Sequence, residues 1–127
     1  MLVFPDTNVL YRIRLADLLL RSCAMHLFTL AWSEELLSEL SRVLSEKKVD
    51  VLITENLSDF PASDVGEQCE VCTPDEFFSR LIRKYPLEMN LIIREIIEQL
   101  IRPRLTLEEL RQQYANSGLL EFARLIA

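Results

Sequence analysis

The chain has 127 residues, of which half are hydrophobic, 20 are acidic and 14 are lysine or arginine, and its formal net charge is −6 at pH 7. This length fits one compact domain, and two glycines and five prolines are too few for a disordered or low-complexity chain. The negative charge disfavours non-specific nucleic-acid binding. No apolar run reaches the roughly 18 residues of a membrane span.

Cysteine usage predicts a cytoplasmic protein. Three cysteines are an odd number, unlike a secreted disulfide framework, and no basic segment leads into an apolar run at the N-terminus. Cys69 and Cys72 form a C-x-x-C sequence, a pattern that can bind zinc or act in redox chemistry. Here "QCEVC" is typical of a strand, on which residues three apart face opposite sides, so we expect the two sulfurs to diverge.

Strands and helices alternate in the first part of the chain. "LVFP" predicts a short apolar strand, and the apolar spacing after it predicts a helix over 8–21. "HLFTLAWS" predicts a second strand, and Ser33 is a candidate N-cap for the helix through "SEKK". Residues 49–53 predict a buried strand that ends in polar residues at Thr54.

The second part is mainly helical. After the strand "QCEVC", Thr73 is a candidate N-cap and Pro74 suits the first helical position of "PDEFFSRLIRK". "LEMNLIIREIIEQLI" predicts a helix with a broad apolar face. Thr106 and Glu109 predict a capping box, Gly118 predicts the end of that helix, and "LLEFARLIA" predicts a last short helix.

This alternation indicates an α/β fold with a mostly parallel sheet, whose ligands lie outside the carboxyl ends of the strands. Asp6 follows the first strand, and Asn56 and Asp59 follow the strand that ends at Thr54. Glu39 lies on the helix after the second strand, from which its side chain can reach the same edge. Asp6, Glu39 and Asp59 are therefore candidates for one site.

Carboxylate clusters suit hard divalent cations such as Mg²⁺ and Mn²⁺, which prefer oxygen ligands. Mutual repulsion makes such a cluster stable only with cations or protons between its members. Two-metal sites use it to align an attacking water and a leaving oxygen during phosphodiester cleavage. From spacing alone the same acids also fit a solvated helix face and a turn, and both interpretations stay open.

The segments "PDTNVL", "SEELLSELSRVL" and "VDVLITENLSDFP", in this order, resemble a PIN-domain protein. "CEVCTPDEFFSRLI" is similar to the strand and "PDEF" helix of such proteins, and "LTLEELRQQYANSGLLEFARLI" to a C-terminal extension in one PIN subgroup. The resemblance implies a three-layer, Rossmann-like fold with a short, mostly parallel sheet flanked by helices. It places a PIN-like domain at residues 1–86 and a helical C-terminal extension at 87–127.

PIN domains are mostly metal-dependent ribonucleases, and many are toxins of VapC-type toxin–antitoxin pairs. The resemblance therefore implies an Mg²⁺- or Mn²⁺-dependent endoribonuclease acting on RNA, with an antitoxin as protein partner and a homodimer as oligomeric state. It assigns metal binding and catalysis to Asp6, Glu39 and Asp59, with Glu35 ranked below Glu39. Supporting polar residues are Thr7, Thr54 and Asn56.

The chain departs from the family pattern at one place. Intact members carry an edge strand, helices and a third acid, in a segment like "DRHVLAAA", where "SRVLSEKK" here runs into "VDVLIT" near residues 45–50. About 50 residues are absent, judged from ordinary lengths of strand-and-helix units. Asp50 cannot replace the third acid, because it starts its strand. The sheet order 2-1-4-5, in the family's strand numbering, is expected to persist, and loss of the helices exposes apolar surface.

Two other functions remain as alternatives. The missing third acid favours a degenerate, non-catalytic PIN relative that binds a protein partner. A nucleotide or phosphate binder is disfavoured, because the chain has no glycine-rich phosphate loop. Arg12, Arg14 and Arg21 are candidates for RNA contacts, although solvated helix surface is the commoner role. For His26 we expect a surface or capping role, and the apolar face of residues 87–101 suits packing on the domain or on a second copy.

Overall fold

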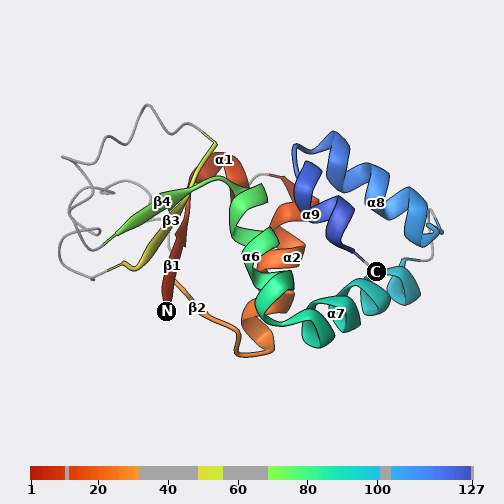
Figure 1. The fold of residues 1–127 in the computed structure, drawn as a ribbon, viewed down its shortest axis with the longest axis horizontal. Coiled ribbons are helices and arrows are strands. Elements are labelled where there is room, and N and C mark those ends of the chain that lie inside the picture. Colours follow the sequence, from red (N-terminus) through yellow and green to blue (C-terminus); the bar gives the residue numbers. More distant parts are fainter. Residues whose placement is uncertain (11, 32–48, 56–68, 101–103, 127) are drawn as a thin grey trace. The chain divides into compact units, whose positions relative to one another are not determined.

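The computed structural model in Figure 1 describes residues 1–10, 12–31, 49–55, 69–100 and 104–126. The chain divides into two compact units, Met1–Thr73 and Pro74–Ala127. The sequence prediction places the boundary after residue 86 instead. The difference arises because the helix that begins at Pro74 packs on helices of the second unit.

Four parallel strands form one sheet in the described part of the first unit. They are β1 (Leu2–Pro5), β2 (Thr29–Leu30), β3 (Val51–Ile53) and β4 (Glu70–Cys72). Their order is β2-β1-β3-β4, and Figure 1 shows β1, β3 and β4 side by side. The resemblance to PIN domains numbers β3 and β4 as the fourth and fifth strands, and in that numbering the observed order agrees with the expected 2-1-4-5. An α/β fold is thereby confirmed for the described residues.

The sheet holds the apolar core of this unit. Phe4 pairs with Leu52, and Leu52 pairs with Val71, so these side chains share one face. Phe4, Val49 and Leu52 are almost fully buried there. Near-continuous apolar runs such as "LVFP" and "VLI" are typical of parallel strands buried on both faces.

Cys69 and Cys72 lie on different sides of the sheet, as the strand pattern predicts. Cys69 packs against the face that carries Phe4 and Leu52. Cys72 is fully buried and pairs with Ile53 in β3. Because Ile53 directly follows Leu52, Ile53 and Cys72 face the opposite side of the sheet. Both cysteines are free thiols. A shared zinc or disulfide role for this C-x-x-C therefore does not fit the strand geometry.

Two helices follow β1, α1 (Thr7–Leu10) and α2 (Ile13–Ala24), where the sequence predicts one helix over 8–21. α2 ends in a Schellman motif. The His26 N–H donates to the Cys23 carbonyl at 2.9 Å and the Leu27 N–H donates to the Ser22 carbonyl at 3.3 Å. His26 is exposed with φ at +62°, the left-handed conformation this motif needs. Its predicted surface or capping role is confirmed.

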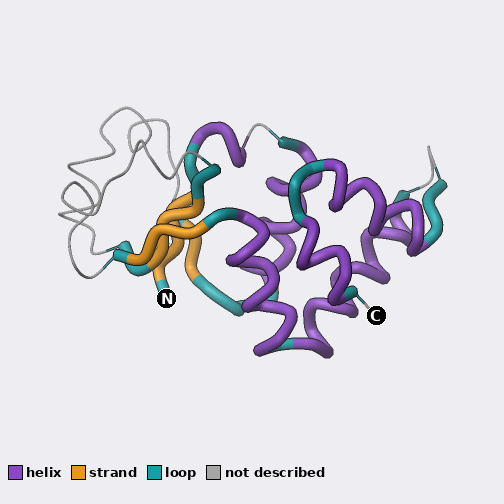
Figure 2. The backbone as a smooth tube through the Cα atoms, turned by 45° about the horizontal axis from the view of Figure 1, so that its top comes forward, coloured by secondary structure: helices purple, strands orange, loops and turns teal. Residues whose placement is uncertain are grey.

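The second unit is helical. Its described helices are α6 (Pro74–Lys84), α7 (Pro86–Gln99), α8 (Leu107–Asn116) and α9 (Leu120–Leu125). Figure 2 shows the short loops that join α6 to α7 and α8 to α9. None of the helices in the described ranges is both long and apolar enough to cross a membrane.

The helix-capping residues predicted from the sequence cap helices of this unit at the expected positions. Thr106 and Glu109 form the predicted capping box at the start of α8. α8 ends at a second Schellman motif, in which Gly118 has φ at +94° and the Leu119 N–H donates to the Tyr114 carbonyl at 2.9 Å. On α7, Ile92 and Ile96 are buried, whereas Leu91 is half-exposed.

Side chains from α6 and α8 hold the short helix α9 at both ends. The Asp75 carboxylate accepts hydrogen bonds from the backbone N–H groups of Phe122 at 2.8 Å and Glu121 at 3.1 Å. The Arg111 guanidinium donates to the carbonyls of Ala123 at 3.1 Å and Ile126 at 2.7 Å. Each charge has the sign that the helix dipole favours at that end. A helix of six residues needs such support, because isolated short helices are unstable in water.

Aromatic packing joins the same helices. The ring of Phe122 lies 5.6 Å from that of Phe78 in α6 and 5.4 Å from that of Tyr114 in α8, measured between centroids. All three residues are fully buried. Aromatic pairs at this spacing stabilise a core beyond simple burial. α9 is therefore held by polar contacts from Asp75 and Arg111 at its ends and by aromatic packing of Phe122 between them.

We expect the Asp75→Ala variant to lose about 2 kcal/mol of unfolding free energy, because the variant leaves two helix N–H groups without their charged acceptor. Urea unfolding of the full chain followed by circular dichroism measures this loss. Glu95→Gln, at an exposed position of α7, is the control for the loss of one acid in this unit, and should change stability by less than about 0.5 kcal/mol. Equal stability of Asp75→Ala and the parent chain would contradict the capping role.

Burial raises the pKa of the Cys69 thiol above its ordinary value of 9.0, and the charges of Asp50 and Glu70 add to this, against a backbone hydrogen bond from Leu52. Less thiolate is then present at a given pH, so alkylation slows. We expect iodoacetamide to modify Cys69 more slowly in the folded chain than in concentrated urea, with the folded rate still rising above pH 9.0. Peptide mass spectrometry resolves this cysteine, and a plateau below that pH would contradict the prediction.

Candidate functional site

Asp6 stands at the carboxyl end of β1, where the strand gives way to α1. Its backbone N–H donates to the Ile53 carbonyl at 2.8 Å, which extends the pairing of β1 with β3 by one residue. Its carbonyl accepts from the Val9 and Leu10 N–H groups at 3.0 and 3.2 Å, which begins α1. The backbone of Asp6 is thus held from both sides. The Asp6 carboxylate therefore starts from a fixed position at this edge of the sheet.

Thr54 fixes that carboxylate from the neighbouring strand. The Thr54 hydroxyl donates to Asp6 Oδ2 at 2.9 Å, across 48 residues of sequence. Thr54 itself is fully buried, and its N–H donates to the Cys72 carbonyl at 2.9 Å. Hydrogen bonds to an ionised carboxylate are among the stronger ones in proteins. Thr54 therefore joins the ends of β1 and β4 to the end of β3, through its hydroxyl and its backbone N–H respectively.

An ion pair involves the residue that follows Thr54. Arg12 Nη1 is 2.7 Å from Glu55 Oε1, and Glu55 directly follows Thr54. Arg12 is the N-cap residue of α2. The side chains keep 44% and 32% of their surface exposed. This edge of the sheet therefore carries Asp6, Thr54, Glu55 and Arg12.

The other predicted site residues have different outcomes. Glu39, Asp59, Asn56 and the lower-ranked Glu35 lie outside the described residues, and so does the side chain of Thr7, whose backbone opens α1. Within the described ranges no three His, Cys, Asp or Glu side chains are grouped closely enough to hold a metal ion. Metal binding by Asp6, Glu39 and Asp59 stays a prediction.

Asp50 lies at the opposite end of the sheet, as its place at the start of β3 predicts. Its carboxylate accepts from the Leu2 N–H at 2.6 Å, and its own N–H donates to the Leu2 carbonyl at 2.9 Å. Both contacts join the starts of β1 and β3. Asp50 therefore serves strand pairing at the edge away from Asp6.

Comparison with known proteins identifies the second unit. Residues 74–127 match the family model of the VapC50 C-terminal domain. This match supports a VapC-like toxin family. The matched residues are those of the compact unit Pro74–Ala127, so the matched region coincides with a structural unit. No curated protein and no solved structure matches the chain.

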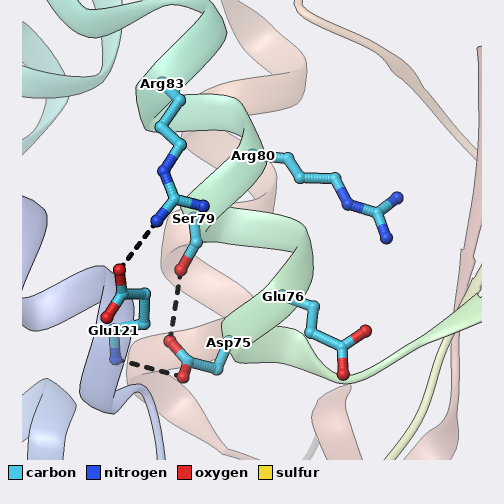
Figure 3. A pocket seen from close by; sticks show the side chains of 6 residues that line it. All are labelled: Asp75, Glu76, Ser79, Arg80, Arg83 and Glu121. Atoms are coloured by element: carbon cyan, nitrogen blue, oxygen red, sulfur yellow. Dashed lines mark hydrogen bonds and ion pairs between the residues drawn. The ribbon is translucent and has the colours of Figure 1, made fainter.

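The unit Pro74–Ala127 carries an open pocket of about 340 Å³, shown in Figure 3. Its lining residues are Asp75, Glu76, Ser79, Arg80, Arg83 and Glu121. Figure 3 shows Asp75, Ser79 and Arg83 turned towards Glu121, whereas Arg80 and Glu76 extend away from it. Arg83 pairs with Glu121 at 2.7 Å, and Asp75 caps α9 beside them. These contacts give the pocket wall a role in holding α6 and α9 together.

Glu121, an acid of this wall, pairs with both Arg83 and Arg124. A hydrogen bond from Arg124, with the positive charges of Arg124 and Arg83, lowers the pKa of its carboxyl from the ordinary 4.5. Because the pKa of Glu121 is lower in the folded chain, its pairing with the arginines stabilises the folded state at pH values above the ordinary pKa. This stabilisation of the folded state is lost as the pH falls through the lowered pKa.

Two residues escape prediction from the sequence. Glu55 is assigned no role by any motif in the sequence. The one signal for it is its position next to Thr54, directly after the end of a strand. Asp75 belongs to a helix-start pattern, and nothing local shows that it caps a helix 47 residues away. Both depend on contacts between distant segments.

Proposed function

We propose that this chain is a PIN-type, Mg²⁺- or Mn²⁺-dependent endoribonuclease that hydrolyses RNA phosphodiester bonds as the toxin of a toxin–antitoxin pair. The observation that carries the proposal is the hydrogen bond from Thr54 to Asp6 Oδ2. It orients the first acid of the predicted metal site at the carboxyl edge of a parallel sheet, where such folds bind ligands. The family match of residues 74–127 supports the toxin assignment.

The donors at this edge fit a hard divalent cation. Asp6 supplies carboxylate oxygens, and the Thr54 hydroxyl orients one of them, as hydrogen-bonding partners of metal ligands commonly do. In the proposal Glu39 and Asp59 complete the ligand set, with Thr7 and Asn56 as supporting polar residues. The bound cation would supply Lewis-acid stabilisation of charge on the phosphodiester oxygens.

The residues of the chain then divide the remaining tasks. Asp6 holds its place because its backbone bonds to β3 and to α1. Thr54 keeps the carboxylate in one orientation, which spares the site reorganisation when charge develops. A cognate antitoxin and a second copy of the chain are the proposed protein partners.

A non-catalytic role as a partner-binding protein is the second candidate. The observation in its favour is that the family match lies on residues 74–127, away from the strands that carry Asp6 and Thr54. Calorimetric titration with Mn²⁺ separates the two functions. The nuclease proposal requires Mn²⁺ binding that depends on Asp6, whereas the partner-binding role does not require Mn²⁺ binding.

We expect Asp6→Asn to abolish metal-dependent RNA cleavage and leave the fold intact, because the amide lacks the negative charge that the cation needs. Cleavage of a labelled single-stranded RNA with Mg²⁺ or Mn²⁺ measures the effect. Asp50→Asn is the matched control, an equal charge change at the other edge of the same sheet, and should keep activity. Full cleavage by Asp6→Asn would reject the site.

We expect Thr54→Val to weaken Mn²⁺ binding about 10- to 100-fold, the usual cost of losing a residue that orients a metal ligand. Valine keeps the shape of threonine but cannot donate to Asp6. Thr54→Ser retains the hydroxyl and should bind Mn²⁺ within a few-fold of the parent chain. Similar Mn²⁺ affinity in Thr54→Val and Thr54→Ser would exclude a role for this hydrogen bond in metal binding.

A further inference from the structure

The Arg12–Glu55 ion pair stands at the same edge of the sheet as the candidate site. Glu55 is the residue after Thr54, whose hydroxyl binds Asp6, and Arg12 reaches it from 43 residues away with 2.7 Å between Nη1 and Oε1. The pairing of β1 with β3 therefore places the positive Arg12 guanidinium, as well as the Asp6 carboxylate, at this edge. The contact joins the start of α2 to the end of β3.

Stability alone is a weak reason for this pair. Arg12 is 44% exposed and Glu55 is 32% exposed, and ion pairs in such positions add little to folding. Exposure also keeps the Arg12 guanidinium within reach of a ligand in solvent. The planar guanidinium suits phosphate, which it can bind through two parallel hydrogen bonds.

An RNA substrate needs positive charge at this edge. The chain carries a net charge of −6, and the proposed metal site is built of acids, so a phosphate outside the metal is repelled. Arg21, another arginine of α2, hydrogen-bonds both carboxylate oxygens of Asp17 at 3.0 Å. It lies nine residues after Arg12, or about 13 Å farther along the helix direction.

We infer that Arg12 binds a phosphate of the RNA substrate beside the metal site, and that Glu55 occupies its guanidinium until the phosphate replaces it. This inference rests on the proposed ribonuclease function. Glu55 then acts as a competing anion, so removing its charge strengthens RNA binding while removing the charge of Arg12 weakens it. If the ion pair were purely structural, removing either charge would change RNA affinity in the same direction.

RNA binding by the full chain tests the inference without cleavage. The Asp6→Asn chain serves as the background, a fluorescently labelled single-stranded RNA is the probe, and anisotropy is measured from about 50 to about 200 mM salt. Circular dichroism verifies folding of each variant. Arg21→Gln is the matched control, since it removes the same charge from the same helix.

We expect Arg12→Gln to weaken binding about tenfold and to reduce the salt slope by about 0.7, the value for one phosphate of a single strand. Arg21→Gln should change affinity less than about twofold, and Glu55→Gln should strengthen binding about threefold. Arg12→Lys, which keeps the charge but not the planar guanidinium, should restore the salt slope and only part of the affinity, even if glutamine perturbs the loop.

Other outcomes overturn the inference in distinguishable ways. Equal losses in Arg12→Gln and Arg21→Gln, or losses in both Arg12→Gln and Glu55→Gln, would reject Arg12 as a phosphate ligand and leave the ribonuclease proposal in place. Failure of every chain, including the background, to bind RNA would reject the RNA substrate itself, and the inference with it.

Discussion

The parallel pairing of β1 with β3 is the constraint on which the candidate site depends. Pro5 pairs with Ile53, so the next residues of the two strands, Asp6 and Thr54, come together at the carboxyl edge. A slip of one residue would turn the side chains of β3 to the opposite faces and remove the hydroxyl from the carboxylate. The apolar pairs Phe4–Leu52, which is buried, and Leu52–Val71, which is partly buried, oppose such a slip.

A second constraint organises the unit that matches the VapC50 C-terminal domain. α9 is too short to be stable alone, and it is held by Asp75 at its start and Arg111 at its end while Phe122 fills the aromatic centre. Polar capping and apolar burial thus support the same helix. This explains why α6, which the sequence assigns to the N-terminal domain, belongs to the second compact unit: its Asp75 is the cap of α9.

The charge distribution of this acidic chain is compatible with the proposed RNA substrate. Net charge describes the whole molecule, whereas recognition of a phosphate depends on the few groups near it. Arg12 pairs with Glu55, the residue that follows the Asp6-binding Thr54, and the two opposite charges balance there. A chain of net charge −6 can therefore present a local cation to a polyanion and still resist non-specific binding elsewhere.

Features governed by a few neighbouring residues are determined by the sequence itself. The apolar runs of β1 and β3, the capping box of Thr106 and Glu109, and the turn at Gly118 follow from local patterns, because capping and strand formation act over one or two turns of backbone. The position of Asp6 at a strand end is readable for the same reason. Only the tertiary structure decides that Thr54 binds Asp6, that Glu55 binds Arg12 and that Asp75 caps α9. Each of these contacts joins residues more than 40 positions apart, so each depends on strand register and helix packing that no local pattern encodes.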